Sequence, residues 1–232
     1  MAMISDNISR IQKDIAAVCQ RLGRSPKDIT VIGVTKYGDV EAVKQVVTAG
    51  ITHIGENRVQ DAKEKIPFLG DLTKNLTTHM IGHLQTNKVK EAIEIFDVIQ
   101  SVDSVKLAEE IERQAEKIDK EVKVLIQVNT SGEPQKFGVN ESEVVATVKQ
   151  VAELPHIRIL GLMTIASFTD DKNVVRGCFQ ELKKIQDTIA KEFKGHERVS
   201  MQYLSMGMTS DYEIALEEGS NMVRIGRAIF SN

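Results

Sequence analysis

Lys36 is the residue of this chain whose position most directly suggests chemistry. It follows Ile29–Thr35, a run without charge and rich in the β-branched residues that favour a buried strand. An amine at the end of such a strand is expected at a sheet edge or barrel mouth, where desolvation lowers its pKa and makes it a nucleophile able to form a Schiff base. Two ordinary explanations stay open: a side chain that extends to solvent, or an ion pair with Glu56.

Two later segments have the composition of a phosphate-binding site. Ser205–Thr209 is rich in hydroxyl groups and holds Gly207, which lets backbone N–H groups approach a ligand closely. Gly226-Arg227-Ala228 opens a short helical turn whose N–H groups favour an anion. Each segment could also be an ordinary turn. Together with Lys36 they fit a phosphorylated aldehyde, for which pyridoxal 5′-phosphate (PLP) is the candidate.

The elements that position these residues alternate between short β-rich runs and amphipathic helices. Strands are predicted at residues 29–35, 52–55, 78–82, 96–102, 122–128, 157–164, 199–206 and 222–225. Apolar residues at helical spacing precede the first strand and recur between later ones. The sets are Ile4, Ile8, Ile11, Ile15, Val18 and Leu22; Leu107, Ile111 and Ile118; Val144, Val148 and Val151; and Val175, Cys178, Leu182, Ile185, Ile189 and Phe193.

Eight strand–helix units predict an α/β fold, a parallel sheet closed into a (β/α)8 TIM barrel with one extra N-terminal helix. An open, doubly wound sheet is the alternative. The length of 232 residues is close to the ~250 typical of this barrel, and no linker divides the chain, so residues 1–232 are predicted to form one domain. Such barrels carry their chemistry at the C-terminal ends of the strands, where Lys36 and both loops are expected.

Bulk properties exclude several classes of partner. The net charge of −3 gives no field that recruits nucleic acid or an anionic membrane, and neither a signal peptide nor a run of ~20 apolar residues is present. The two cysteines, Cys19 and Cys178, suggest reduced thiols in a cytoplasmic protein. No metal site is predicted, because His79 and His83 on one strand face lie ~13 Å apart. The remaining histidines, His53, His156 and His196, are expected at strand edges or on the surface.

A set of motifs along nearly the whole chain resembles the pyridoxal phosphate homeostasis proteins, the YggS or PROSC family. They begin with Val34-Thr35-Lys36, residues 54–60 (IGENRVQ), residues 79–88 (HMIGHLQTNK) and residues 128–133 (VNTSGE). They continue with residues 161–164 (GLMT), residues 205–209 (SMGMT) with Asp211, and residues 223–226 (VRIG) with Ile229 and Phe230. The resemblance implies a fold-type III PLP barrel similar to that of bacterial alanine racemase.

The resemblance also implies a role for individual residues. Lys36 holds PLP as a covalent internal aldimine, and Asn57 and Met163 line its ring. Arg224 faces the pyridine nitrogen, where a cation disfavours protonation and makes PLP a poor electron sink. The phosphate is surrounded by Ser205, Gly207, Met208, Gly226 and Arg227, largely through backbone N–H groups. No catalytic residue is assigned.

The chain departs from the commoner family pattern at three places. Tyr37-Gly38-Asp39 replaces a short polar run, Arg227 stands where some relatives have Thr, and no glycine follows Phe230. Because Arg227 replaces this Thr, the resemblance does not predict a direct contact between the side chain at this position and the phosphate.

Two functions remain open for a PLP barrel: a non-catalytic carrier that buffers and delivers the cofactor to apo-enzymes, or an amino-acid racemase. An alanine-racemase site takes a second base, a tyrosine, from an added domain for which the length leaves no room. Of Tyr37, Tyr203 and Tyr212, only Tyr37 adjoins the site, and alternation points it away if the strand continues. The carrier is favoured, and a monomer is expected because the racemase dimer involves that domain. A PLP-free phosphosugar lyase or Schiff-base aldolase is disfavoured, because such sites need a further acid–base pair close to the lysine and only Glu56 is evident.

Overall fold

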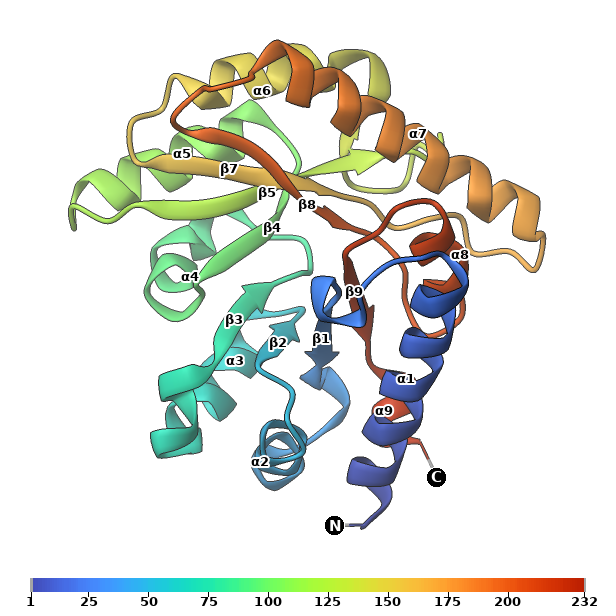
Figure 1. The fold of residues 1–232 in the computed structure, drawn as a ribbon. Helices are drawn as coiled ribbons and strands as arrows, with labels where there is room; N and C mark the ends of the chain where they lie inside the picture. The colour runs from blue at the N-terminus through green and yellow to red at the C-terminus, as the bar shows by residue number, and fades with distance from the viewer. Residues whose placement is uncertain (1, 232) are drawn as a thin grey trace.

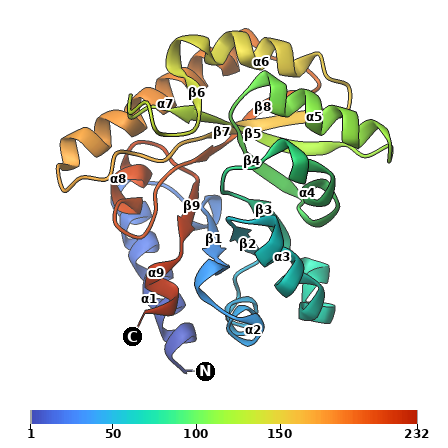
Figure 2. The ribbon, with the colours of Figure 1, turned by 180° about the vertical axis from the view of Figure 1, so that it is seen from behind.

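Eight parallel strands close into a barrel in the computed structural model, which describes residues 2–231 (Figures 1 and 2). Each strand pairs with its neighbours in chain order, and β9 returns to pair with β1. The predicted TIM barrel is confirmed, and the open sheet is wrong because the β1–β9 and β4–β5 pairings leave no edge. The barrel strands are β1 (Thr30–Val34), β2 (His53–Glu56), β3 (Thr77–Met80), β4 (Val98–Val102), β5 (Val122–Asn129), β7 (Ile157–Met163), β8 (Val199–Ser205) and β9 (Met222–Ile225).

Helices cover the outside of the barrel, as Figures 1 and 2 show from opposite sides. Side-chain caps start several of them: Asp39 Oδ1 accepts from Ala42 N at 2.9 Å, and Ser104 and Asp171 cap later helices. The helices are α1 (Ala2–Arg21), α2 (Val40–Thr48), α3 (Val59–Lys65), α4 (Val89–Ile95), α5 (Val105–Glu116), α6 (Val144–Ala152), α7 (Lys172–Glu192), α8 (Tyr212–Glu217) and α9 (Arg227–Phe230). None of those within residues 2–231 combines the length and apolarity needed to span a bilayer.

The extra helix α1, at the start of the chain, packs against the last helix, α9. Its apolar stripe is buried as predicted, and it packs against α2, α8 and α9 (Figure 1). Asn7 Nδ2 donates to the backbone oxygens of Ile229 and Ser231, at 3.1 and 3.0 Å. These bonds satisfy carbonyl groups at the C-terminus of α9 and so hold this short helix in place.

Two expectations about the elements need correction. Ile118 is 50% exposed and lies outside α5, because the helix ends at Glu116 and the following turn puts Asp119 at a positive φ of 48°. The two-residue strand β6 (Val139–Asn140), which pairs with β5, was not predicted. A bridge this short has no periodicity to read in the sequence.

The strands divide the side chains between two environments. Outward-facing residues pack against the helices, while the barrel interior holds the apolar cluster Ile32, Val98, Leu125, Leu160, Met163 and Met222. Alternation along β9 shows the division: Val223 and Ile225 pack outward, whereas Met222 and Arg224 face inward. The polar residues at the C-terminal ends of the strands therefore meet above a packed interior.

Candidate functional site

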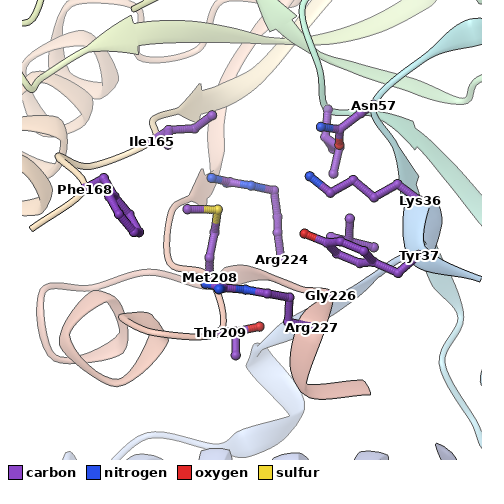
Figure 3. Close-up of a pocket in the computed structure, with 12 residues that line it drawn as sticks. Lys36, Tyr37, Asn57, Ile165, Phe168, Met208, Thr209, Arg224, Gly226 and Arg227 are labelled. Atoms are coloured by element: carbon purple, nitrogen blue, oxygen red, sulfur yellow. The ribbon is translucent and has the colours of Figure 1, made fainter. Parts of the chain in front are cut away.

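A cavity of ≈370 Å³ lies at the C-terminal ends of the strands, on the side where both candidate loops emerge (Figure 3). This volume falls within the ~300–1,000 Å³ of small-molecule and cofactor sites. Lys36 and Asn57 project into it from just beyond the ends of β1 and β2, and Arg224 projects into it from β9 (Figure 3). Its lining is Val34, Lys36, Tyr37, Asn57, Ile81, Ile165, Phe168, Met208, Thr209, Arg224, Gly226 and Arg227.

Lys36 lies in a single 3-10 turn, Thr35–Tyr37, that begins where β1 ends. The turn carries Lys36 above the layer of strand ends, so the residue is exposed and the expected desolvation is absent. The alternative explanation, an ion pair between Lys36 and Glu56, is also contradicted by the structure. Glu56 is buried on the outer face of β2, where its Oε1 accepts from Thr35 Oγ1 at 2.7 Å and from Lys65 Nζ at 3.0 Å.

The Glu56 contacts position the turn that carries Lys36. Lys65 Nζ also donates to the backbone oxygen of Thr35, at 2.9 Å. The turn is therefore tied to β2 and α3 through Thr35, while the Lys36 amine stays outside that ion pair. An amine held in this way is available for condensation with a carbonyl compound.

Arg224 supplies a buried positive charge at the floor of the cavity. It is 4% exposed, and its Nη1 and Nη2 donate to Ser205 Oγ and to the Thr164 backbone oxygen, both at 2.7 Å. Burial lowers the pKa of Arg224 to about 10, and the charge of Asp211 opposes this shift. The guanidinium therefore remains a cation at neutral pH, and it favours an acceptor atom or a negative charge above it.

The loop after β8 is shaped by Gly207 and Asp211. Gly207 has a φ of +96°, and an added Cβ would lie 2.6 Å from Ala215 Cβ and 2.9 Å from Tyr212 Cα. Asp211 Oδ1 accepts from Met208 N at 2.5 Å, and Gly207 O accepts from Arg224 N at 2.9 Å. Burial raises the pKa of Asp211, against the opposing effects of the Met208 N–H and the Arg224 charge. The loop is thus fixed to both α8 and β9.

The second candidate loop continues directly into α9. Gly226 is the N-cap, and an added Cβ there would lie 2.9 Å from Tyr37 Cε2. Thr209 Oγ1 accepts from Ala228 N at 3.5 Å, which links the two candidate loops. This corner of the cavity therefore combines a helix N-terminus with a threonine hydroxyl, groups that would favour an anion.

The structure brings most of the predicted site residues to one cavity. Lys36, Asn57, Met208, Arg224, Gly226 and Arg227 line it. Met163, Ser205 and Gly207 do not: Met163 belongs to the apolar interior, Ser205 is fully buried beside Arg224, and Gly207 shapes the loop from behind. The Ser205 hydroxyl is bound to Arg224 and Gln100, so its side chain is engaged below the cavity floor.

Sequence reasoning missed several residues of the cavity wall. Tyr37 was expected to point away, but β1 stops at Val34 and the following turn brings Tyr37 to the cavity, its ring centroid 5.1 Å from Lys36 Nζ. Thr209 had a signal, because it belongs to the hydroxyl-rich loop. Ile165 and Phe168 follow β7 in a segment without motif, and Phe168 is 94% exposed at the rim.

The histidines have partners that their spacing did not reveal. His53 was expected at an edge or on the surface, yet it is half-buried with its Nδ1 3.0 Å from His79 Nε2. His83 stacks on Phe137 at a centroid distance of 3.8 Å, and its Nδ1 lies 3.1 Å from Asp103 Oδ2. Within residues 2–231 no group of three metal-ligating side chains occurs.

The shape of the loop after β8 leads to a stability prediction. Gly207→Ala should destabilise the chain by roughly 2–5 kcal/mol, because alanine is strained at this φ and its methyl group overlaps Ala215 and the Tyr212 backbone. The free energy of unfolding in urea measures this. Gly177→Ala in α7 is the matched control, since nothing lies within 4 Å of its added Cβ, and it should stabilise by roughly 0.5–1 kcal/mol. Equal stability of the Gly207→Ala variant and the wild type would contradict the close packing of this loop.

Comparison with known proteins identifies relatives over the full length of the chain. The family model for the alanine racemase N-terminal domain matches residues 7–232. The pyridoxal phosphate homeostasis protein of Aquifex aeolicus is 37% identical over 225 residues, which cover 97% of this chain and 96% of the relative. The protein of the same name from Escherichia coli is 35% identical over 228 residues, which cover 98% and 95%.

Solved structures agree with the sequence relatives. A crystal structure of an unknown protein from Bifidobacterium adolescentis has a TM-score of 0.93 at 35% identity, covering 99% of this chain and 95% of that one. PipY of Synechococcus elongatus with PLP bound has a TM-score of 0.81 at 33% identity, covering 94% and 100%. An alanine racemase of Clostridium difficile shares the fold, with a TM-score of 0.78 at 16% identity, but only 57% of that chain is covered.

Proposed function

The chain belongs to the alanine racemase N-terminal domain family and, within it, to the pyridoxal phosphate homeostasis proteins, and from this premise we propose how its cavity serves that role. It is a PLP-binding protein of PLP homeostasis, like PipY, whose solved structure holds PLP. Its residues would hold the cofactor, buffer its concentration and release it to PLP-dependent apo-enzymes.

One observation carries the proposal: an exposed lysine amine and a buried arginine cation face the same cavity (Figure 3). Arg224 donates to a serine hydroxyl and to a backbone oxygen, neither of which carries a charge, so its positive charge remains available to a ligand. PLP has an aldehyde for the amine and a pyridine nitrogen for the cation. The residues present therefore fit this cofactor.

In our proposal Lys36 would hold PLP covalently, through a C=N bond formed from its amine and the aldehyde with loss of water. Asn57 would lie along the ring, whereas Met163 lies below the cavity in the apolar interior and would support the ring only from beneath. The phosphate would lie between the loop after β8 and the α9 N-terminus. The Met208 N–H of that loop is bound to Asp211, and Ser205 and Gly207 do not line the cavity. The backbone N–H groups would therefore come chiefly from Gly226 and Arg227 at the start of α9. The wall residues Thr209 and Arg227 add a hydroxyl and a positive charge at the same corner.

The surroundings of Arg224 favour a carrier over an amino-acid racemase. A guanidinium that stays protonated donates a hydrogen bond to the pyridine nitrogen but gives it no proton, so the ring withdraws few electrons from a bound substrate. Tyr37 is the one tyrosine at the cavity, and it comes from the same turn and the same side as Lys36 (Figure 3). Lys36 and Tyr37 therefore do not provide the two bases on opposite faces of a substrate that an amino-acid racemase needs.

The remaining expectations complete the proposal. We propose that residues 1–232 act as a single monomeric domain in the cytoplasm. The partners are PLP and PLP-dependent apo-enzymes; the net charge of −3 argues against nucleic acid and anionic membranes.

The carrier proposal predicts an absence of turnover. When the PLP-loaded chain is incubated with L-alanine in deuterated water, the α-proton signal in the NMR spectrum should persist, whereas an alanine racemase control should erase it. The same preparation should restore activity to a PLP-free apo-enzyme. Rapid α-proton exchange that disappears in Lys36→Ala would instead establish a racemase-type site.

A further inference from the structure

The barrel interior contains a continuous line of polar side chains beside its apolar cluster. The line starts at Arg224 below the proposed cofactor site and passes through Ser205, Gln100 and His79 to His53. We call these five residues the interior chain. Apart from His53, its members are nearly fully buried, with exposures of 4% or less. Buried polar groups are costly unless every one is paired, so their partners carry information.

Each link of the interior chain is a hydrogen bond of ordinary length. Arg224 Nη1 lies 2.7 Å from Ser205 Oγ, which lies 2.7 Å from Gln100 Oε1. Gln100 Nε2 lies 3.0 Å from His79 Nδ1, and His79 Nε2 lies 3.0 Å from His53 Nδ1. The links join β9, β8, β4, β3 and β2 across the interior, including strands that are not neighbours in the sheet.

The interior chain runs through the barrel from one mouth to the other. His53 and His79 line a second cavity of ≈340 Å³ on the side opposite the proposed cofactor site. That cavity is bounded by the residues that open the strands, among them Thr77, Val98 and Met222. Arg224, at the other end, lines the cavity that contains Lys36.

The direction of every hydrogen bond follows from Arg224. A guanidinium can only donate, so Ser205 Oγ accepts from it and turns its own proton to Gln100 Oε1. The Gln100 amide group must then donate from Nε2, one proton to His79 Nδ1 and the other toward Met222 Sδ at 3.2 Å. His79 consequently carries its proton on Nε2 and donates to His53 Nδ1.

This directional order limits the freedom of Arg224. Its Nη2 is held by the Thr164 oxygen and its Nη1 by Ser205, so the two bonds fix the plane of the guanidinium. Ser205 can rotate about its Cβ–Oγ bond, and only the acceptor on Gln100 keeps its lone pairs toward Arg224. The His79 ring in turn prevents the Gln100 amide from turning over.

We propose that Gln100 and His79, acting through Ser205, are positioning residues that hold the Arg224 guanidinium in the orientation needed to face the cofactor ring. This inference rests on the proposed function, in which Arg224 faces the pyridine nitrogen of PLP. It assigns Ser205 a second role beneath the phosphate loop, as the link between Arg224 and the rest of the interior chain.

The test substitutes one residue of the interior chain at a time and measures the NMR signals of the Arg224 guanidinium group. Gln100→Met keeps the length of the side chain but removes its hydrogen bonds to Ser205, His79 and Met222. Ser205→Ala removes the hydroxyl group that joins Gln100 to Arg224. In NMR spectra of the isotope-labelled full chain without PLP, the Arg224 guanidinium protons should be sharp in the wild type and broadened in both variants. Gln127→Met is the matched control, because Gln127 is a buried glutamine in β5 that bonds to Phe137 O outside the interior chain.

PLP-loaded protein provides the second readout. Both variants should release PLP roughly three- to tenfold faster than the wild type, the range that corresponds to the loss of one ordinary hydrogen bond. In both variants the absorption spectrum of bound PLP should depend on pH differently than in the wild type. The double variant should release PLP no faster than the faster of the two single variants, because both residues act on Arg224 through one path. Gln127→Met should leave all of these properties at wild-type values.

The two readouts separate this inference from the proposed function. Arg224 signals in Gln100→Met and Ser205→Ala that match the wild type would overturn the positioning role, whatever happens to PLP. Failure of the wild-type chain to bind PLP would instead count against the proposed function, while the Arg224 signals would still decide the inference. If Gln100→Met does not fold, Ser205→Ala decides it, since this variant removes a single hydroxyl group.

Discussion

Replacing Lys36 with alanine is expected to abolish the covalent attachment of PLP. Borohydride converts the proposed C=N bond to a stable amine, so the wild-type chain should carry PLP on one peptide that contains Lys36. Labelling of the Lys36→Ala variant should fall below roughly a tenth of the wild-type level, because a Schiff base needs an unengaged amine beside the bound aldehyde. Mass spectrometry of the digested protein measures both values.

The neighbouring lysine is not expected to replace Lys36. Lys65 is the other amine tied to the same turn, but its Nζ is hydrogen-bonded to Glu56 and to the Thr35 oxygen. Lys65 is therefore engaged by two acceptors behind the turn, and it is not among the residues that line the cavity.

A matched variant separates covalent from ionic effects. Lys36→Arg keeps a positive charge at the cavity and cannot condense with an aldehyde, so it should bind PLP weakly and resist borohydride labelling. Undiminished labelling in Lys36→Ala, or labelling that moves to Lys65, would sink the assignment of the covalent site to Lys36.

The barrel and the position of Lys36 were predictable because they depend on local patterns. β-Branched runs without charge give the strands, and the apolar stripes of α1, α6 and α7 give the helices that cover them. A lysine directly after an uncharged strand stands out for the same reason. The loops after β8 and β9 were recognisable because Gly207 and Gly226 stand beside hydroxyl and basic residues.

The contacts of individual side chains were not predictable, because they depend on where each strand stops and on which face each residue lies. A strand β1 that continued through Tyr37 would have pointed this side chain away from the cavity, but β1 ends at Val34. Glu56 ends its strand next to Asn57, yet it faces the helices and binds Lys65. The Gln100–Ser205 bond joins β4 and β8, which meet only because the barrel closes.

Gln100 is a polar residue in a predicted strand, but the sequence does not show which residues it contacts. It interrupts the apolar run Val98–Val102, and a buried amide in such a strand requires partners. Those partners come from the preceding strand β3 and from β8, where Ser205 is 105 residues away, and the residue types alone name neither of them.

Acid is expected to destabilise the chain through His79 before most carboxylates titrate. Burial lowers the pKa of His79 to about 3, and the neighbouring His53 adds to the shift. The unfolded chain therefore binds a proton at His79 below its ordinary pKa of 6.5, whereas the folded chain does not. The stability from neutral His79 is present above pH 6.5 and is lost as the pH falls toward 3, at up to ~1.4 kcal/mol per pH unit.

Two other histidines, His53 and His156, change how steeply the free energy of unfolding falls with decreasing pH. Burial also lowers the pKa of His53, although Asp97 opposes the shift, so His53 contributes with the same sign as His79. The Glu112 carboxylate raises the pKa of His156, to which it is hydrogen-bonded at 2.6 Å. A protonated His156 stabilises the folded chain at low pH, so His156 acts against the loss.

Unfolding in urea between pH 7 and pH 5 tests this balance in a range where ordinary carboxylates remain ionised. His79→Asn should be less stable than the wild type at pH 7, because Gln100 and His53 lose their partner, yet its stability should fall less steeply with acid. His156→Asn should do the reverse and steepen the fall. Equal slopes in the wild type and His79→Asn would mean that His79 takes up its proton equally in the folded and unfolded states. The neutral, directional order of the interior chain would then be wrong.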